Sequence, residues 1–321
     1  MSEASTDVDR VDTSHPQHVP PRPGEDQPLH PRLGTRGSPD ARSQAGGGAG
    51  FVTVNNRLFA PLQGLDANNV LQGGYGWLSV TDNGATFHPG LDLNSGGSCN
   101  ADEGAGVVAP LAGVVRAVFP WNGVTYGEGN HVWVELDDPC CPGPTFWHTD
   151  HLHDILVSVG QRVTPGQPIG LCGRTGGWDC AHAHTELAKS VPADGWWQWP
   201  YGWSRAQVEA AYWNPSQWWA AATALVLAEN HQPIPPEVVT VLSDWEVLNW
   251  VMPDLWKWAG VPYNSEALTS KAWLKELREG RYRGRPRTAD RRYGDGRGDW
   301  AEFDYGTVVT RSDSGEWSWH G

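Results

Sequence analysis

Short apolar runs alternate with turn residues between positions 51 and 195 of the chain. Gly, Pro or Asn interrupts these runs about every ten residues. The runs cover residues 107–119, 131–136, 155–173 and 183–187. Runs of this length that are rich in Val, Ile and Leu are typical of β-strands joined by tight turns. The pattern predicts a mainly β domain over residues 51–195, an antiparallel β-sandwich or open barrel.

A different pattern, with helical spacing and many Trp residues, occupies residues 196–277. Its two longest stretches are residues 204–230 and 235–260. Ser204 is the expected N-cap of the first, and Pro236 stands near the start of the second. We expect a small helical appendage whose Trp side chains mainly fill its own core, with stacking on sugars or peptides as the alternative.

The two ends of the chain are poor in apolar residues. Residues 1–50 are rich in Pro, Gly, Ser, Asp and Arg, and such a segment buries too little apolar surface to offset the entropy of ordering. We therefore expect a disordered tail there. Residues 278–321 begin with an Arg- and Gly-rich stretch, for which a flexible, solvated segment is the expectation and a contact to wall polyanions the alternative.

The net charge and the hydropathy of the chain argue against some classes of function. The 321 residues carry a formal net charge of −14, which argues against nucleic-acid binding because that depends on Lys and Arg neutralising phosphates. The sequence contains no run of the roughly 18 apolar residues needed to cross a membrane, so a membrane-spanning helix is not expected. The first residues also lack the basic and then apolar profile of a secretory signal peptide.

Five cysteines leave at least one thiol unpaired within a monomer. They are Cys99, Cys140, Cys141, Cys172 and Cys180. Their spacing does not match a paired zinc knuckle, so the alternatives are one or two disulfides or buried thiols. We expect Cys172 to pair with Cys180, because the two bracket a short turn.

Two short motifs within the predicted β domain carry candidate metal chemistry. His182 and His184 are two residues apart on a predicted strand, so both side chains point to one face. His88 and Asp92 flank a Pro-Gly turn that can bring their side chains together. Two His nitrogens and one carboxylate oxygen form a three-ligand zinc set that leaves a fourth position open, which is typical of catalytic zinc.

These motifs, in their order, resemble the LytM-type, lysostaphin-like zinc endopeptidases of the duplicated hybrid motif fold. The resemblance is carried by FHPGLDLN, VVAPLAGVVRAV, HLHDILVSVGQRVTPGQPIGLCGRTG and AHAHTEL, and it spans roughly residues 70–190. It implies that His88, Asp92 and His184 are the zinc ligands. It also implies that His182 and His151 are catalytic, since His151 precedes Gly160 by the family's spacing.

Several neighbouring residues leave alternatives open. His148 and His153 compete with His151 for the catalytic position, and His131 and His148 are otherwise expected to be structural or surface residues. Cys180 lies on the same predicted strand face as the histidines, where a thiolate ligand is an alternative to a disulfide or buried thiol. Glu186 is on the correct face to orient a metal-bound imidazole.

The expected function is a zinc metalloendopeptidase that hydrolyses stem or cross-bridge peptides of bacterial peptidoglycan, in wall remodelling or in phage-type lysis. The alternative is a non-catalytic wall-binding or hydrolase-activating module. Zn²⁺ is the expected cofactor and peptidoglycan peptides are the expected partner. Such a protein is expected to act at the cell wall or outside the cell, by an export route that the sequence does not reveal.

Overall fold

The computed structural model describes nine segments of the chain. These are residues 53–65, 75–81, 86–95, 98–123, 127–137, 145–191, 199–292, 298–311 and 314–321. The predicted N-terminal tail, residues 1–50, lies outside the described residues, as do Cys140 and Cys141.

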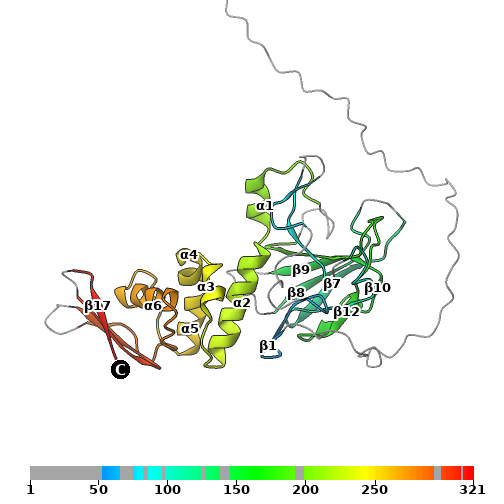
Figure 1. The fold of residues 1–321 in the computed structure, drawn as a ribbon. Helices are drawn as coiled ribbons and strands as arrows, with labels where there is room; N and C mark the ends of the chain where they lie inside the picture. The colour runs from blue at the N-terminus through cyan, green and yellow to red at the C-terminus, as the bar shows by residue number, and fades with distance from the viewer. Residues whose placement is uncertain are drawn as a thin grey trace, which may run out of the picture. The chain divides into compact units, whose positions relative to one another are not determined.

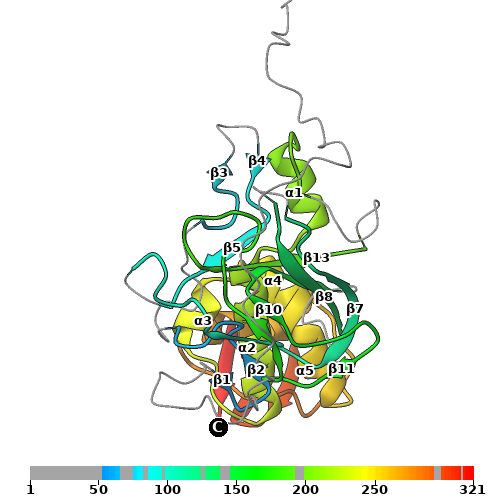
Figure 2. The same ribbon diagram turned by 90° about the vertical axis from the view of Figure 1, so that its right-hand side faces the viewer.

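A six-stranded antiparallel sheet forms the centre of the β domain (Figures 1 and 2). Its strand order is β11-β7-β8-β9-β13-β5. The strands are β5 (Gly90–Leu93), β7 (Gly113–Phe119), β8 (Asn130–Leu136), β9 (Phe146–Leu152), β11 (Arg162–Val163) and β13 (Ala183–Ala188). Each predicted apolar run therefore contains at least one strand.

Smaller antiparallel sheets accompany the main sheet. One has the order β10-β12-β6, and two are hairpins, β1-β2 and β3-β4. The strands are β1 (Thr53–Val54), β2 (Leu58–Phe59), β3 (Val80–Thr81), β4 (Thr86–Phe87), β6 (Gly106–Val108), β10 (Asp154–Ile155) and β12 (Pro168–Leu171). The predicted fold class, mainly antiparallel β with a helical Trp-rich region, is confirmed.

The two faces of the main sheet differ in chemistry because successive side chains along a strand point in opposite directions. One face carries Val132, Val134 and Trp147, which are almost fully buried in the main hydrophobic core. The opposite face carries Trp133 and the polar residues of the candidate site. Both faces are buried, so polar side chains on the second face need partners within the protein.

Helices occupy residues 205–278, as predicted. They are α1 (Arg205–Ala211), α2 (Pro215–Glu229), α3 (Pro236–Thr240), α4 (Asp244–Glu246), the π-helix η2 (Val247–Val251), α5 (Met252–Trp258) and α6 (Leu268–Arg278). Ser204 is the N-cap of α1 and forms a reciprocal capping box with Gln207. In the described part of the chain, none of these helices is long and apolar enough to cross a membrane.

The first predicted helical stretch is divided at Tyr212 and Trp213, which add to the main sheet. Tyr212 forms an antiparallel bridge with Ala188 of β13, and the Trp213 amide donates to the Leu187 carbonyl at 2.8 Å. Asn214 then caps α2 through its side chain. The strand β13 is thus held at its C-terminal end by residues that belong to the helical part of the chain.

Four of the Trp side chains in the helical region are interior, as expected. Trp218, Trp250, Trp256 and Trp273 are each at most 8% exposed. They belong to the hydrophobic cluster that also contains the strand residues of the β domain. Trp245 and Trp258 are exposed, at 62% and 36%.

The C-terminal segment differs from the flexible stretch that the sequence suggested. It contains a four-stranded antiparallel sheet of β14 (Arg291–Arg292), β15 (Asp299–Phe303), β16 (Gly306–Thr310) and β17 (Trp317–His320). Phe303 and Val308 are buried in the main core cluster. The domain boundaries at residues 195 and 277 remain predictions, but the expectation of an irregular segment was wrong for these strands.

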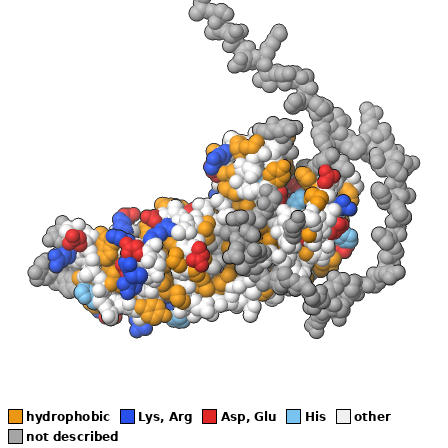
Figure 3. All heavy atoms as spheres, viewed as in Figure 1, with side chains coloured by type: hydrophobic (Ala, Val, Ile, Leu, Met, Phe, Trp, Pro, Cys, Tyr) orange, Lys and Arg blue, Asp and Glu red, His pale blue; other side chains and the backbone are white. Residues whose placement is uncertain are grey.

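The Arg side chains of this segment form internal ion pairs, which explains how an Arg-rich sequence folds. Glu276 of α6 accepts hydrogen bonds from Arg281 and Arg283, and Asp304 accepts one from Arg287. Basic and acidic side chains accordingly lie next to each other on the face shown in Figure 3. These three Arg residues are neutralised within the chain, which weakens the alternative of a polyanion contact.

The cysteine pairing differs from the expected one. Cys180 is bonded to Cys99, and Cys172 is a free thiol that is fully buried in the core. Burial raises the pKa of the Cys172 thiol. The local turn was a poor guide because Cys172 points into the hydrophobic core, and the true partner is 81 residues away in sequence.

Candidate metal centre

The edge strand β5 and its neighbour β13 bring the two predicted motifs together. Their antiparallel register places His184 opposite Asp92 and Glu186 opposite Gly90. A Cβ atom at position 90 would lie 2.2 Å from the Thr185 carbonyl oxygen, so only glycine permits this close pairing. The sequence HPGLD therefore places both of its potential ligands beside β13.

The orientation of the His88 ring is fixed by two backbone carbonyls. Its Nδ1 donates to the carbonyl oxygens of Gly90 at 2.8 Å and Gly76 at 3.1 Å. Since carbonyl oxygens only accept, Nδ1 carries the proton and Nε2 presents its lone pair. This Nε2 faces the carboxylate of Asp92.

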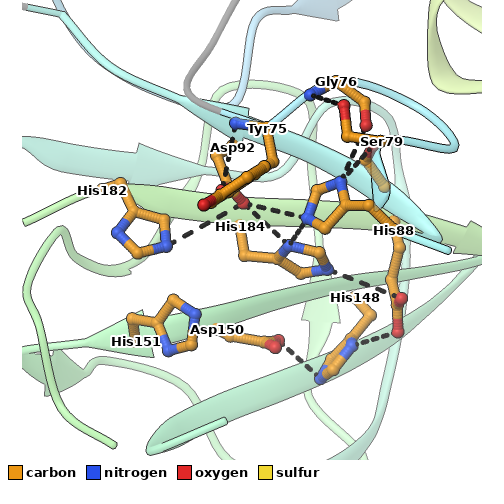
Figure 4. A network of polar contacts seen from close by, with 12 residues as sticks. Tyr75, Gly76, Ser79, His88, Asp92, His148, Asp150, His151, His182 and His184 are labelled. Atoms are coloured by element: carbon orange, nitrogen blue, oxygen red, sulfur yellow. Dashed lines mark hydrogen bonds and ion pairs between the residues drawn. The ribbon is translucent and has the colours of Figure 1, made fainter. Parts of the chain in front are cut away.

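Three donor atoms converge beside β13 (Figure 4). His88 Nε2 lies 3.0 Å from His184 Nδ1 and 3.2 Å from Asp92 Oδ1. His184 Nδ1 lies 3.0 Å from the same Asp92 oxygen. The backbone amide of Tyr75 donates to the other carboxylate oxygen, Oδ2, at 3.3 Å. All three side chains are buried.

This donor set fits a zinc ion. Ligands held at about 2.0–2.1 Å from zinc in a tetrahedral arrangement lie about 3.3 Å from each other, close to the spacings of His88, Asp92 and His184. One carboxylate oxygen and two imidazole nitrogens facing each other in a buried space also repel unless a cation lies among them. Within the described residues, this is the one group with such geometry.

Electrostatics keep Asp92 in the charged form that a metal requires. Burial alone would raise the pKa of its carboxyl, but the neighbouring imidazoles of His184 and His88 hold that pKa well below its usual range. An anionic carboxylate next to two imidazoles is a zinc-type ligand set.

His151 and His182 lie next to the three donors. Their ring centroids are 4.6 Å apart, and His182 Nε2 is 3.9 Å from Asp92 Oδ1. Each ring donates from Nδ1 to a backbone carbonyl, of Thr175 at 3.2 Å and of Cys180 at 3.0 Å respectively. In the neutral ring, a proton on Nδ1 leaves Nε2 as the acceptor that a general base requires.

The backbone of β9 is distorted where it presents His151. This residue has φ of 61°, in the left-handed region that residues other than glycine rarely adopt. Burial, with a contribution from His182, lowers the pKa of His151 to about 3. The ring is therefore neutral at physiological pH. Strained backbone of this kind often occurs at functional positions.

Aromatic side chains border the five residues. Trp178 lies 5.3 Å from the His151 ring, and its indole donates to the Gly127 carbonyl at 3.1 Å. Trp199 lies 6.0 Å from the His88 ring.

The structure shows where the other histidines near the motif lie. His153 is exposed and pairs with Asp154, away from the donors. His131 and His148 are buried, so the surface interpretation of these two was wrong. His148 contacts Glu186 and Asp150.

The contact between His148 and Asp150 was not predicted from the sequence. The two residues alternate on β9, as His182 and His184 do on their strand, and this alternation was the available signal.

Comparison with known proteins bears on the same region. Residues 86–195 match the family model described as Peptidase family M23. We call this matched stretch the M23 segment. It includes His88, Asp92, His151, His182 and His184, and the match confirms the resemblance that the motifs predicted.

Solved structures similar to this chain include a prophage-encoded M23 protein and an antimicrobial peptidase. The catalytic domain of the prophage-encoded M23 protein EnpA from Enterococcus faecalis is 25% identical, with 37% of this chain and 82% of that chain covered and a TM-score of 0.30. The catalytic domain of lysostaphin from Staphylococcus simulans is 27% identical, with coverage of 41% and 90% and a TM-score of 0.32.

A larger lysostaphin structure shows how much of such proteins the similarity spans. It is 24% identical, with 47% of this chain and 51% of that chain covered and a TM-score of 0.34. The chain thus matches about half of that lysostaphin structure. Comparison with curated proteins found no match. The match of the M23 segment to this peptidase family supports a metallopeptidase function in general terms.

Proposed function

We propose that this protein is a zinc-dependent metalloendopeptidase that hydrolyses peptide bonds in bacterial peptidoglycan. The observation that carries the proposal is the convergence of His88, Asp92 and His184 with two further histidines at their side. A binding module needs no pair of imidazoles beside its metal site, whereas hydrolysis needs bases at that position. The M23 match supports the reaction class and the wall substrate.

The chemistry divides between metal and protein. Zinc in this site would polarise the scissile carbonyl and lower the pKa of water toward neutrality. His88, Asp92 and His184 would hold it. Of the two flanking histidines, one accepts the proton of the attacking water at its Nε2, and either can deliver a proton to the leaving amine. The backbone carbonyls of Thr175 and Cys180 keep both rings in the required tautomer.

The disulfide supports an extracellular site of action. A bond such as that between Cys99 and Cys180 persists in oxidising environments and is rare in the reducing cytosol. We propose that the protein acts at the cell wall, on stem or cross-bridge peptides.

The test measures zinc content and the loss of turbidity of purified cell walls in parallel. Asp92→Ala is expected to lose both zinc and cleavage, whereas His182→Ala is expected to lose cleavage while it retains zinc. His153→Ala is the matched control, because this exposed histidine lies two residues from His151 and contacts only Asp154 among the groups near it. It is expected to behave as the native protein.

The outcomes separate the proposal from its alternative. Undiminished cleavage by both Asp92→Ala and His182→Ala would contradict the proposed site. A native protein that binds zinc but cleaves neither walls nor oligoglycine peptides would instead indicate a non-catalytic wall-binding or activating module.

A further inference from the structure

A row of polar side chains extends from the candidate metal centre across the buried face of the main sheet. The register of β13 and β9 places Glu186 opposite His148, and alternation along both strands puts His184 and Asp150 on the same face. On the next strand, Trp133 stacks on the His148 ring, with centroids 4.0 Å apart and planes 8° from parallel. None of these residues is more than 2% exposed.

His148 lies between two carboxylates. Its Nδ1 is 2.6 Å from Glu186 Oε1, and its Nε2 is 2.8 Å from Asp150 Oδ1 (Figure 4). A ring nitrogen without a proton would repel a carboxylate oxygen at such distances, so both nitrogens carry protons and the ring is a cation. Burial would lower the pKa of His148, but Asp150 and Glu186 raise it to about 10.

Glu186 extends this contact to the metal centre. Its second oxygen, Oε2, lies 3.5 Å from His184 Nε2. Among the described residues, neither atom has a hydrogen-bond partner elsewhere, and both are shielded from solvent. Glu186 is thus the carboxylate placed to accept a proton on His184 Nε2, and with the proton there the Nδ1 lone pair of His184 is directed at the Asp92 side.

We propose that His148 is a positioning residue that holds Glu186 against His184 and so fixes the tautomer and direction of that metal ligand. The proposal rests on the proposed zinc site and extends it by two residues, His148 and Asp150. The imidazolium neutralises one carboxylate on each of its sides. Without it, two buried carboxylates would repel each other and Glu186 would no longer be held beside the ligand.

The geometry explains why a histidine stands at position 148. Lys and Arg are long and flexible, whereas the short planar imidazolium places its two N–H groups in opposite directions and still stacks flat on Trp133. Asp150 fixes the far nitrogen, so the near nitrogen is aimed at Glu186. An apolar residue could fill the space but could not orient Glu186.

The experiment measures zinc affinity by competition with a chromogenic chelator. His148→Gln and Glu186→Gln are each expected to weaken zinc binding by about 10- to 100-fold, the usual effect of removing a partner of a metal-bound imidazole. Because His148 acts through Glu186, the double variant is expected to bind zinc no more weakly than Glu186→Gln alone. This lack of additivity distinguishes positioning from a general structural effect.

Two further variants distinguish a loss of positioning from misfolding. Asp150→Asn removes only the far contact of His148 and is expected to give a smaller loss of zinc affinity in the same direction. His153→Gln is the control, because this exposed histidine follows the same strand, β9, and its side chain pairs with Asp154. It is expected to keep native zinc affinity.

The results decide separately on the two proposals. Unchanged affinity in both His148→Gln and Asp150→Asn, or losses that add fully in the double variant, would overturn the positioning role. Native protein that binds zinc without cleaving walls would contradict the peptidase proposal alone. Native protein that binds no zinc would contradict both.

Discussion

His151 and His182 face each other with their ring centroids 4.6 Å apart, although they come from different parts of the chain. Each directs Nδ1 to a backbone carbonyl and keeps Nε2 as an acceptor. The pair is nearly symmetric in its hydrogen bonding and asymmetric in its burial, because His151 is the more deeply buried of the two.

The first prediction concerns this pair. His151→Ala and His182→Ala are each expected to lower kcat for wall peptides by about 10²- to 10⁴-fold, the usual contribution of a general acid or base. Zinc content should stay at the native level, since neither ring belongs to the three-atom donor set. Steady-state kinetics on a soluble peptide, with metal analysis of each variant, checks this. Loss of zinc in either variant would instead make that histidine a ligand.

The second prediction concerns acid stability and His131. Burial, followed by repulsion from His148, lowers the pKa of His131 to about 4 in the folded protein, from an ordinary value of 6.5. Between these two pH values the unfolded chain binds a proton that the folded protein does not. The free energy of unfolding therefore falls as pH falls through this window, by about 1–3 kcal/mol from this residue.

The measurement is urea unfolding of metal-free protein at several pH values between 7 and 4. His131→Gln is expected to flatten the slope in this window, whatever its stability at neutral pH. His153→Gln, which changes an exposed histidine, is expected to keep the native slope. An equal slope in native protein and His131→Gln would show that His131 does not titrate in this window.

The third prediction concerns the disulfide. It closes a loop of 81 residues, for which the chain-entropy model gives about 4.5 kcal/mol of stabilisation. Cys99→Ser is expected to lower the free energy of unfolding by up to this amount. It should also reduce kcat, because Cys180 provides the carbonyl that orients His182.

Reductant should act on the native protein in the same direction as the Cys99→Ser substitution. Cys172→Ala serves as the control, since its buried thiol is unpaired and the disulfide remains. Denaturation with and without reductant measures the effect. A native protein indifferent to reductant in both stability and activity would contradict the prediction.

The fourth prediction concerns the close pairing of β5 and β13. Gly90→Ala would place a Cβ atom 2.2 Å from the Thr185 carbonyl oxygen and 3.0 Å from the His184 ring. The strands would have to separate, so zinc affinity and the unfolding temperature should both fall. Gly127→Ala is the control because a Cβ atom there meets nothing within 4 Å. Native zinc affinity in Gly90→Ala would show that the strand contact is not needed.

The sequence predicted much of the β domain and the candidate site because the relevant signals are local. The alternation of His182 and His184 is a property of one strand, and the HPGLD motif is a single turn that leads into a second strand. The N-cap at Ser204 was likewise readable from neighbouring residues. These local patterns are kept in the folded protein because the main sheet buries both of its faces and leaves each strand little freedom of register.

What the sequence did not reveal depends on contacts between distant residues. Cys99 lies 81 residues from its partner, and nothing near either cysteine indicates the pairing. The C-terminal strands were hidden by their Arg content, since Glu276 neutralises Arg281 and Arg283 only after α6 packs beside them. The polar row at His148 also requires two strands to be in register before it exists.

The bridge between Ala188 and Tyr212 has a consequence for how the protein folds during synthesis. A nascent chain that has just emerged as far as residue 195 contains every proposed ligand but lacks the backbone partner of Leu187, which is Trp213. The strand that carries His184 is completed only when that later segment leaves the ribosome. The C-terminal end of this strand therefore gains its last backbone partners from residues beyond the M23 segment.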